Sequence, residues 1–133
     1  MQASLWRGMR QFPLNRTYSL KRHKEFRYTY RAGRRVNAGC FALVTARNRS
    51  GKVQVGFSVS KKVGSSVERN RCKRRLKAAY TPFLPLTQPG RNLIFIARRE
   101  ALFLPFDRMQ KEICKALQKA GLYKEEPAGE VSL

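Results

Sequence analysis

The alternation of side chains between residues 53 and 60 is the feature that most restricts how this chain can fold. Large apolar residues alternate with small or polar ones: Val53, Val55, Phe57 and Val59 against Gln54, Gly56, Ser58 and Ser60. Successive side chains of a β-strand point to opposite faces, so the pattern predicts a strand with one apolar face, which helices must cover. The other face leaves two interpretations equally open. It is either an uncovered groove or a site where small residues admit a closely packed helix.

Signals on both sides of this strand predict an α+β or α/β sandwich built on one mixed sheet. The expected elements are a helix over 19–31 with Ser19 as its N-cap and Gly33 as its stop, a strand over 41–47, the strand over 53–60, a helix from 65 to the proline at 82 or 85, a buried strand over 92–97, and a helix that Pro105 opens and Gly121 ends. We expect one domain over residues 18–124, with a basic tail over 1–17 and an acidic tail over 125–133.

The expected helix that begins near Ser65 is unusually cationic. Six cations fall within nine positions: Arg69, Arg71, Lys73, Arg74, Arg75 and Lys77. At about 100° per residue, Cys72, Leu76, Ala79 and Phe83 form one narrow apolar arc and the cations spread over the rest. Like charges four residues apart repel by a few tenths of a kcal/mol per pair, so stability alone does not favour this arrangement. A solvated surface face is the plainer alternative, but such faces interleave Glu with Lys, and here only Glu68 does so.

Whole-chain charge also indicates a polyanionic partner. Lys and Arg number 29 against 8 acidic residues, a formal net charge of +21 on 133 residues, and a bound polyanion would relieve that self-repulsion. No apolar run approaches the roughly 20 residues that span a bilayer, and the N-terminus lacks a signal-peptide pattern. The three cysteines are widely separated and odd in number, which is typical of a reducing compartment. We therefore expect a cytoplasmic protein without a membrane partner.

The residue types argue against a self-sufficient metal-dependent nuclease. Such an enzyme holds its ions with clustered carboxylates, yet Asp107 is the sole aspartate and the glutamates form no convincing pair in sequence. His23 is the sole histidine and has no evident orienting partner as a general base. We expect no metal or other cofactor bound by the protein alone.

Two adjacent strings resemble a known signature. VGFSVSKKVG at 55–64 and VERNRCKR at 67–74 are similar to the signature of the protein subunit of bacterial ribonuclease P. The resemblance extends over roughly residues 18–124. It implies a four-stranded mixed sheet with three helices in the order α-β-β-β-α-β-α and a left-handed crossover that places the cationic helix.

The resemblance also implies a function. In that family an RNA subunit cleaves precursor tRNA using Mg²⁺, and the protein is an accessory subunit that binds this RNA and the 5′ leader, with no protein partner required. Carried over to this sequence, the positions expected to contact the catalytic RNA are Arg69, Asn70, Arg71, Lys73, Arg74, Arg75 and Lys77. The positions expected in the leader cleft are Phe26, Tyr30 and Tyr123, to which we add Ser58, Ser60, Lys61 and Lys62.

Physical chemistry is consistent with both roles. Arginine can clamp phosphates bidentately, and aromatic rings in a cationic groove stack on unpaired bases with little sequence preference. Phe26 and Tyr30 are one helical turn apart, however, and could both be core residues. A structural ribosomal protein that binds rRNA is the alternative function, because it explains the charge and the size equally well.

Overall fold

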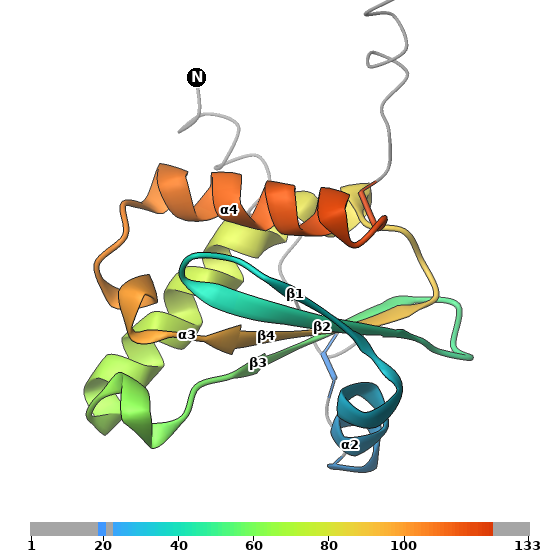
Figure 1. The fold of residues 1–133 in the computed structure, drawn as a ribbon, viewed down its shortest axis with the longest axis horizontal. Helices are drawn as coiled ribbons and strands as arrows, with labels where there is room; N and C mark the ends of the chain where they lie inside the picture. The colour runs from blue at the N-terminus through green and yellow to red at the C-terminus, as the bar shows by residue number, and fades with distance from the viewer. Residues whose placement is uncertain (1–18, 21–22, 124–133) are drawn as a thin grey trace, which may run out of the picture.

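The computed structural model describes residues 19–20 and 23–123, so the tails expected at 1–17 and 125–133 lie outside the described residues. Figure 1 shows the elements, whose labels are used below. They are α2 (His23–Ala32), β1 (Arg34–Asn37), β2 (Phe41–Arg47), β3 (Val53–Ser58), α3 (Ser66–Tyr80), β4 (Arg91–Ala97) and α4 (Phe106–Lys119), with short 3₁₀ helices at Lys61–Val63, Thr81–Leu86 and Arg99–Leu102.

The four strands form one mixed sheet in the order β1-β2-β4-β3. β2 is antiparallel to both β1 and β4, whereas β3 runs parallel to β4, with Val53 opposite Arg91 and Ser58 opposite Ile96. Parallel neighbours need a long crossover connection, and α3 lies within that connection. The expected element order and the mixed four-stranded sheet are confirmed.

The helices cover both faces of the sheet unequally. Figure 1 shows α3 and α4 on one face and α2 alone on the other. The larger core lies under α3 and α4, and the smaller one, formed by Leu20, Val44 and Ile94 with Phe26 and Ile96, lies under α2. The apolar face of β3 belongs to the larger core, as its alternation predicts.

β4 contributes side chains to both cores, because it is an interior strand of the sheet. Leu93 and Phe95 point into the larger core and Ile94 into the smaller one, and all three are fully buried. The Phe95 ring lies 5.2 Å from the rings of Phe41 and Tyr80, centroid to centroid. This confirms that the apolar run over 92–97 is a strand buried on both sides.

The start of the first helix differs from the prediction. The helix begins at His23, and Ser19 is not its N-cap but forms a parallel bridge with Val55. The backbone N–H of Leu20 donates to the carbonyl of Val55 at 2.9 Å. The free edge of β3 supplies this backbone partner, so residues 19–20 are extended and lie against the sheet.

The ends of α3 and α4 follow their predicted signals. Ser65 caps α3 in a capping box, in which its hydroxyl accepts from Glu68 N–H and the Glu68 carboxylate accepts from Ser65 N–H. After α4, Gly121 adopts a φ of 74°, a left-handed conformation that glycine takes without the steric cost of a side chain. The cationic helix is thus fixed at its start by local chemistry.

Candidate nucleic-acid interface

The side chains of α3 divide into three groups. Cys72, Leu76 and Ala79 are fully buried and anchor the helix on the larger core, as predicted. The second group consists of polar side chains that solvent reaches. Its exposed members are Asn70, Arg71, Lys73 and Arg74, and its half-buried members are Arg69 and Lys77. Each is therefore at least partly open to an RNA backbone.

Arg75 forms the third group and differs from the prediction that it lies outward with the other cations. Its guanidinium is half-buried and donates to two backbone carbonyls, that of Ala101 at 2.8 Å and that of Leu104. These carbonyls belong to the segment between β4 and α4, where no neighbouring strand in the described part of the chain supplies a backbone N–H to them. Arg75 therefore ties α3 to this segment, whatever contact with RNA it also makes.

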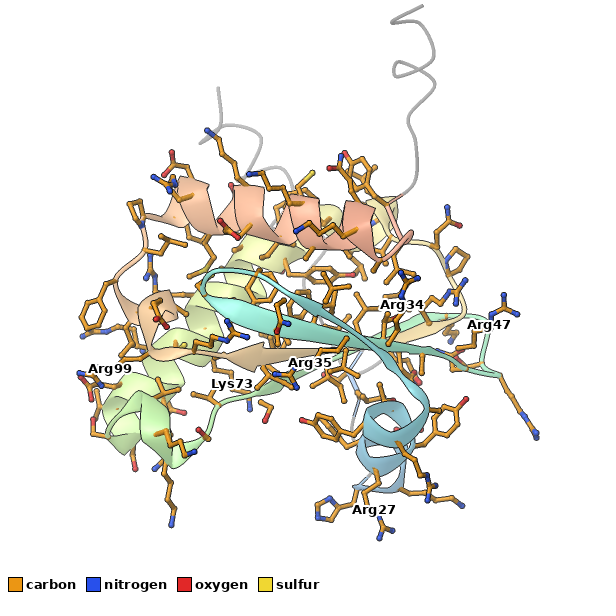
Figure 2. The ribbon with its side chains drawn as sticks, in the orientation of Figure 1. Arg27, Arg34, Arg35, Arg47, Lys73 and Arg99 are labelled. Atoms are coloured by element: carbon orange, nitrogen blue, oxygen red, sulfur yellow. The ribbon has the colours of Figure 1, made fainter. Side chains whose placement is uncertain are left out.

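A cleft of about 260 Å³ joins α3 to the other face of the sheet. Its described lining comes from the segment before α2, from α2, from β3 and from α3: Ser19, Leu20, Phe26, Val55, Gly56, Phe57, Lys73 and Lys77. Figure 2 labels Lys73 on the side of α3 next to β3. One aromatic ring of α2 and two cations of α3 therefore border one hollow across the edge strand, and we call it the edge cleft.

Gly56 makes the edge cleft possible. A Cβ at this position would lie 2.6 Å from Cζ of Phe26 and 3.3 Å from Cβ of Leu20. The close-packing interpretation therefore holds at Gly56, where the Phe26 ring lies directly on the strand backbone. Towards the end of β3 this face opens: Ser58, its last residue, is half-buried, and Ser60, which was expected in the strand but follows it, is exposed.

Phe26 and Tyr30 differ in how deeply they are buried. Phe26 is half-buried against the smaller core, whereas Tyr30 is 44% exposed. Their ring centroids are 6.4 Å apart, so they form one aromatic pair that runs from the sheet outward. Tyr30 also lines a shallow hollow with Lys24, Arg27 and Arg31 of the same helix.

The remaining predicted cleft residues lie in two places. Lys61 and Lys62 are exposed in the 3₁₀ turn after β3, where the Ser60 hydroxyl accepts from the Lys62 N–H at 3.3 Å. Tyr123 lies on the other face of the sheet: its backbone pairs with Thr87 and its ring packs on the larger core. The structure brings Phe26 together with Lys73 and Lys77, places Tyr30 beside Phe26, and does not bring Tyr123 to them.

Ser19 and Leu20 are among the lining residues of the edge cleft that sequence reasoning missed. They were assigned to a helix because Ser19 is a good N-cap residue type. Only the pairing of their backbone with Val55 places them beside Phe26. A pairing with so distant a residue leaves no local pattern in the sequence.

Titratable groups with shifted pKa values on or near α3 include Cys40, Glu68 and Cys72. Burial is the main cause that raises the pKa values of Cys40, to about 11, and of Cys72, so both thiols stay neutral near pH 7. The pKa of Glu68 is lowered, chiefly because its carboxylate accepts from the Ser65 backbone N–H.

Within residues 19–20 and 23–123, no three His, Cys, Asp or Glu side chains are grouped to hold a metal ion. In the same residues no helix is long and apolar enough to cross a membrane.

Together, the fold and the interface define a small basic α+β protein in which a cationic helix borders an aromatic cleft. The family model named Ribonuclease P matches residues 14–121, and the chain belongs to this family. The "Ribonuclease P protein component" of Clostridium botulinum (strain Loch Maree / Type A3) is 37% identical over 105 residues, 78% of this chain and 95% of that protein. The protein of the same name from Roseiflexus sp. (strain RS-1) is 34% identical over 118 residues, 88% of this chain and 97% of that protein.

Solved structures share the fold. The RNase P protein of Staphylococcus aureus is 27% identical with a TM-score of 0.72, over 80% of this chain and 98% of that one. The RNase P protein from Thermotoga maritima, at 17% identity and a TM-score of 0.69 over 76% of this chain and 96% of that one, shows the fold alone. The resemblance first seen in residues 55–74 is therefore confirmed along most of the chain.

Proposed function

We propose that this chain binds the catalytic RNA of ribonuclease P through α3 and the 5′ leader of precursor tRNA in the edge cleft. In this way it assists the maturation of the tRNA 5′ end in the cytoplasm. One observation carries the proposal: Phe26 of α2 and Lys73 and Lys77 of α3 border the same hollow across β3. Family membership favours this function over the ribosomal alternative.

The edge cleft suits an unpaired strand. Each base stacked on an aromatic side chain contributes roughly 1–3 kcal/mol, and lysines attract the phosphates without reading sequence. The aromatic pair of Phe26 and Tyr30 runs outward from the cleft, so successive bases have a ring face to meet. A leader of variable sequence requires this kind of recognition.

The exposed side chains of α3 suit a folded RNA. Arg71 and Arg74 carry planar guanidinium groups that can contact two phosphate oxygens at once. We assign the cleavage chemistry, and the Mg²⁺ that it uses, to the RNA, as the family resemblance implies. The three cysteines are free thiols, which supports a reducing cytoplasm.

Reconstitution with ribonuclease P RNA tests the proposal. The protein should restore leader cleavage at low Mg²⁺, and replacing Arg69, Arg71 and Arg74 together by Ala should weaken RNA binding. Each lost phosphate contact lowers the slope of log K against log[salt] by roughly 0.7–0.9, so the triple variant should lose about 2–3 units of slope.

A matched control removes the same charge from the outer face of α4, where Arg108, Lys111 and Lys115 are exposed. Their replacement by Ala should leave most of the slope in place. Equal losses in the two triple variants would show that only net charge matters and would contradict the role of α3. Co-sedimentation with ribosomal particles without restored cleavage would contradict the proposed function as a whole.

A further inference from the structure

A second, larger hollow lies on the opposite flank of α2. It has a volume of about 520 Å³ and lies between α2 and the turn that joins β2 to β3. Its described lining is Lys24, Glu25, Tyr28, Arg31, Arg47, Asn48, Arg49, Ser50, Gln54 and Asn92. Tyr28 is two residues from Phe26, about 200° around the helix, so its ring points away from the edge cleft. We call this hollow the turn cleft.

The charge of the turn cleft favours an anion. Four cations, Lys24, Arg31, Arg47 and Arg49, line it together with one carboxylate, that of Glu25. Figure 2 shows Arg47 where β2 ends and the turn begins. Cations gathered around a concave surface focus a positive potential there, so a phosphate group would be attracted.

The turn that carries Arg47 and Arg49 is held in one conformation. Asn48 donates to the Lys52 carbonyl and to Oδ1 of Asn92, both at 2.9 Å, and its own Oδ1 accepts from the Gly51 N–H at 3.2 Å. Asn92 is 3% exposed and donates to the Thr29 hydroxyl at 3.1 Å, so the turn is tied to α2 as well. Groups fixed before binding lose less entropy when a ligand arrives.

The turn cleft also offers groups that recognise a base. Tyr28 is 41% exposed, which leaves part of its ring open to stacking. Gln54 lies beside Asn92 in the sheet register and adds an amide, which both donates and accepts hydrogen bonds. The volume lies in the range of small-molecule sites and is too small for a duplex.

We propose that the turn cleft binds one nucleotide of single-stranded RNA, with its phosphate among the four cations and its base against Tyr28. This goes beyond the proposed function, which places RNA in the edge cleft and on α3. Helix α2 would then separate two sites for unpaired RNA, one on each flank.

Replacing one amide by a carboxylate tests the proposal in the full chain. Gln54→Glu changes no side-chain volume and places a carboxylate in the turn cleft. Gln118→Glu makes the same change on the exposed face of α4 and is the matched control. The ¹⁵N-labelled protein is titrated with a short single-stranded oligoribonucleotide, and the side-chain amide signals of Asn48 and Asn92 report on the turn cleft.

We expect saturable shifts of both amide signals, weakened severalfold by Gln54→Glu and unchanged by Gln118→Glu. Tyr28→Leu should weaken binding at these signals by about 5- to 150-fold, the equivalent of the roughly 1–3 kcal/mol of one stacked base. Equal weakening by Gln54→Glu and Gln118→Glu, or equal shifts with inorganic phosphate alone, would overturn the proposal.

The backbone amide of Gly56 reports separately on the edge cleft. If its signal shifts while those of Asn48 and Asn92 stay in place, the turn cleft is refuted and the proposed function stands. If the Asn48 and Asn92 signals shift without that of Gly56, the turn cleft holds and the proposed leader site fails.

Discussion

Replacing Gly56 by Ala tests how the edge cleft is built. The new Cβ would lie 2.6 Å from Cζ and 2.8 Å from Cε1 of Phe26, whereas ordinary contact begins at 3.4 Å. The Phe26 ring must therefore move outward by roughly 0.8 Å, because the other partner is the backbone of a paired strand that cannot move as easily. The same substitution changes the shape of the cleft in which we place the leader, because Gly56 and Phe26 both line it.

The cost follows from two opposing terms. Overpacking at a well-packed site typically costs about 1–3 kcal/mol. Gly→Ala also restricts the unfolded chain, which stabilises a protein by about 0.4–1 kcal/mol where the native backbone accepts it, and Gly56 has no positive φ to prevent that. We expect a net loss of about 0.5–2 kcal/mol in the free energy of unfolding.

Gly39→Ala is the matched control. A Cβ there would meet the Glu112 carboxylate at 3.7 Å, which is ordinary contact, and its φ is not in the left-handed region. Urea unfolding should show a lower midpoint for Gly56→Ala at unchanged slope, and an equal or higher midpoint for Gly39→Ala. In the reconstituted ribonucleoprotein, Gly56→Ala should also reduce the preference for precursor over mature tRNA.

The reasoning is refuted if Gly56→Ala is as stable as Gly39→Ala and binds precursor normally. That result would mean that the Phe26 ring is not held against β3. A loss of stability with unchanged preference for precursor would confirm the packing but remove Phe26 from leader binding.

Two further predictions concern buried groups. Arg75→Ala should cost about 2 kcal/mol of stability, because two carbonyls lose a charged donor; thermal unfolding should show a much smaller effect for the exposed Arg74→Ala, and equal effects would contradict the role of Arg75. Burial, aided by the nearby Glu112 charge, raises the pKa of Cys40 from 9.0 to about 11. The folded state therefore holds that proton more tightly, and stability should fall as pH rises from about 9 to 11; if Cys40→Ala does not flatten this part of the pH profile, the raised pKa is wrong.

Much of the fold could be predicted because its signals are local. The alternation that starts at Val53, the apolar run over 92–97 and the stripe of α4 each reflect a periodicity within a single element. Ser65 likewise acts within one turn of its own position. These elements and their assembly into one mixed sheet were predicted from the residues, and the resemblance supplied the fourth strand.

β1 shows why other parts could not be predicted. Of Arg34–Asn37 only Val36 is buried, so this edge strand has no apolar run and is held by its pairing with β2. The bridge between Ser19 and Val55 likewise depends on a partner that is distant in sequence. Pairing of this kind is encoded in the partner strand as much as in the segment itself.

The candidate sites could also be predicted only in part from the sequence. Residue type and resemblance indicated that Phe26 and the cations of α3 bind RNA. No local pattern predicted that Lys73 and Lys77 would lie close to Phe26 across β3. That meeting depends on Gly56, where the missing side chain lets an aromatic ring lie on the strand. The alternation from which the strand was predicted therefore has two effects. Its large residues fill the core under α3 and α4, and its smallest residue sets the depth at which α2 lies and so the width of the edge cleft.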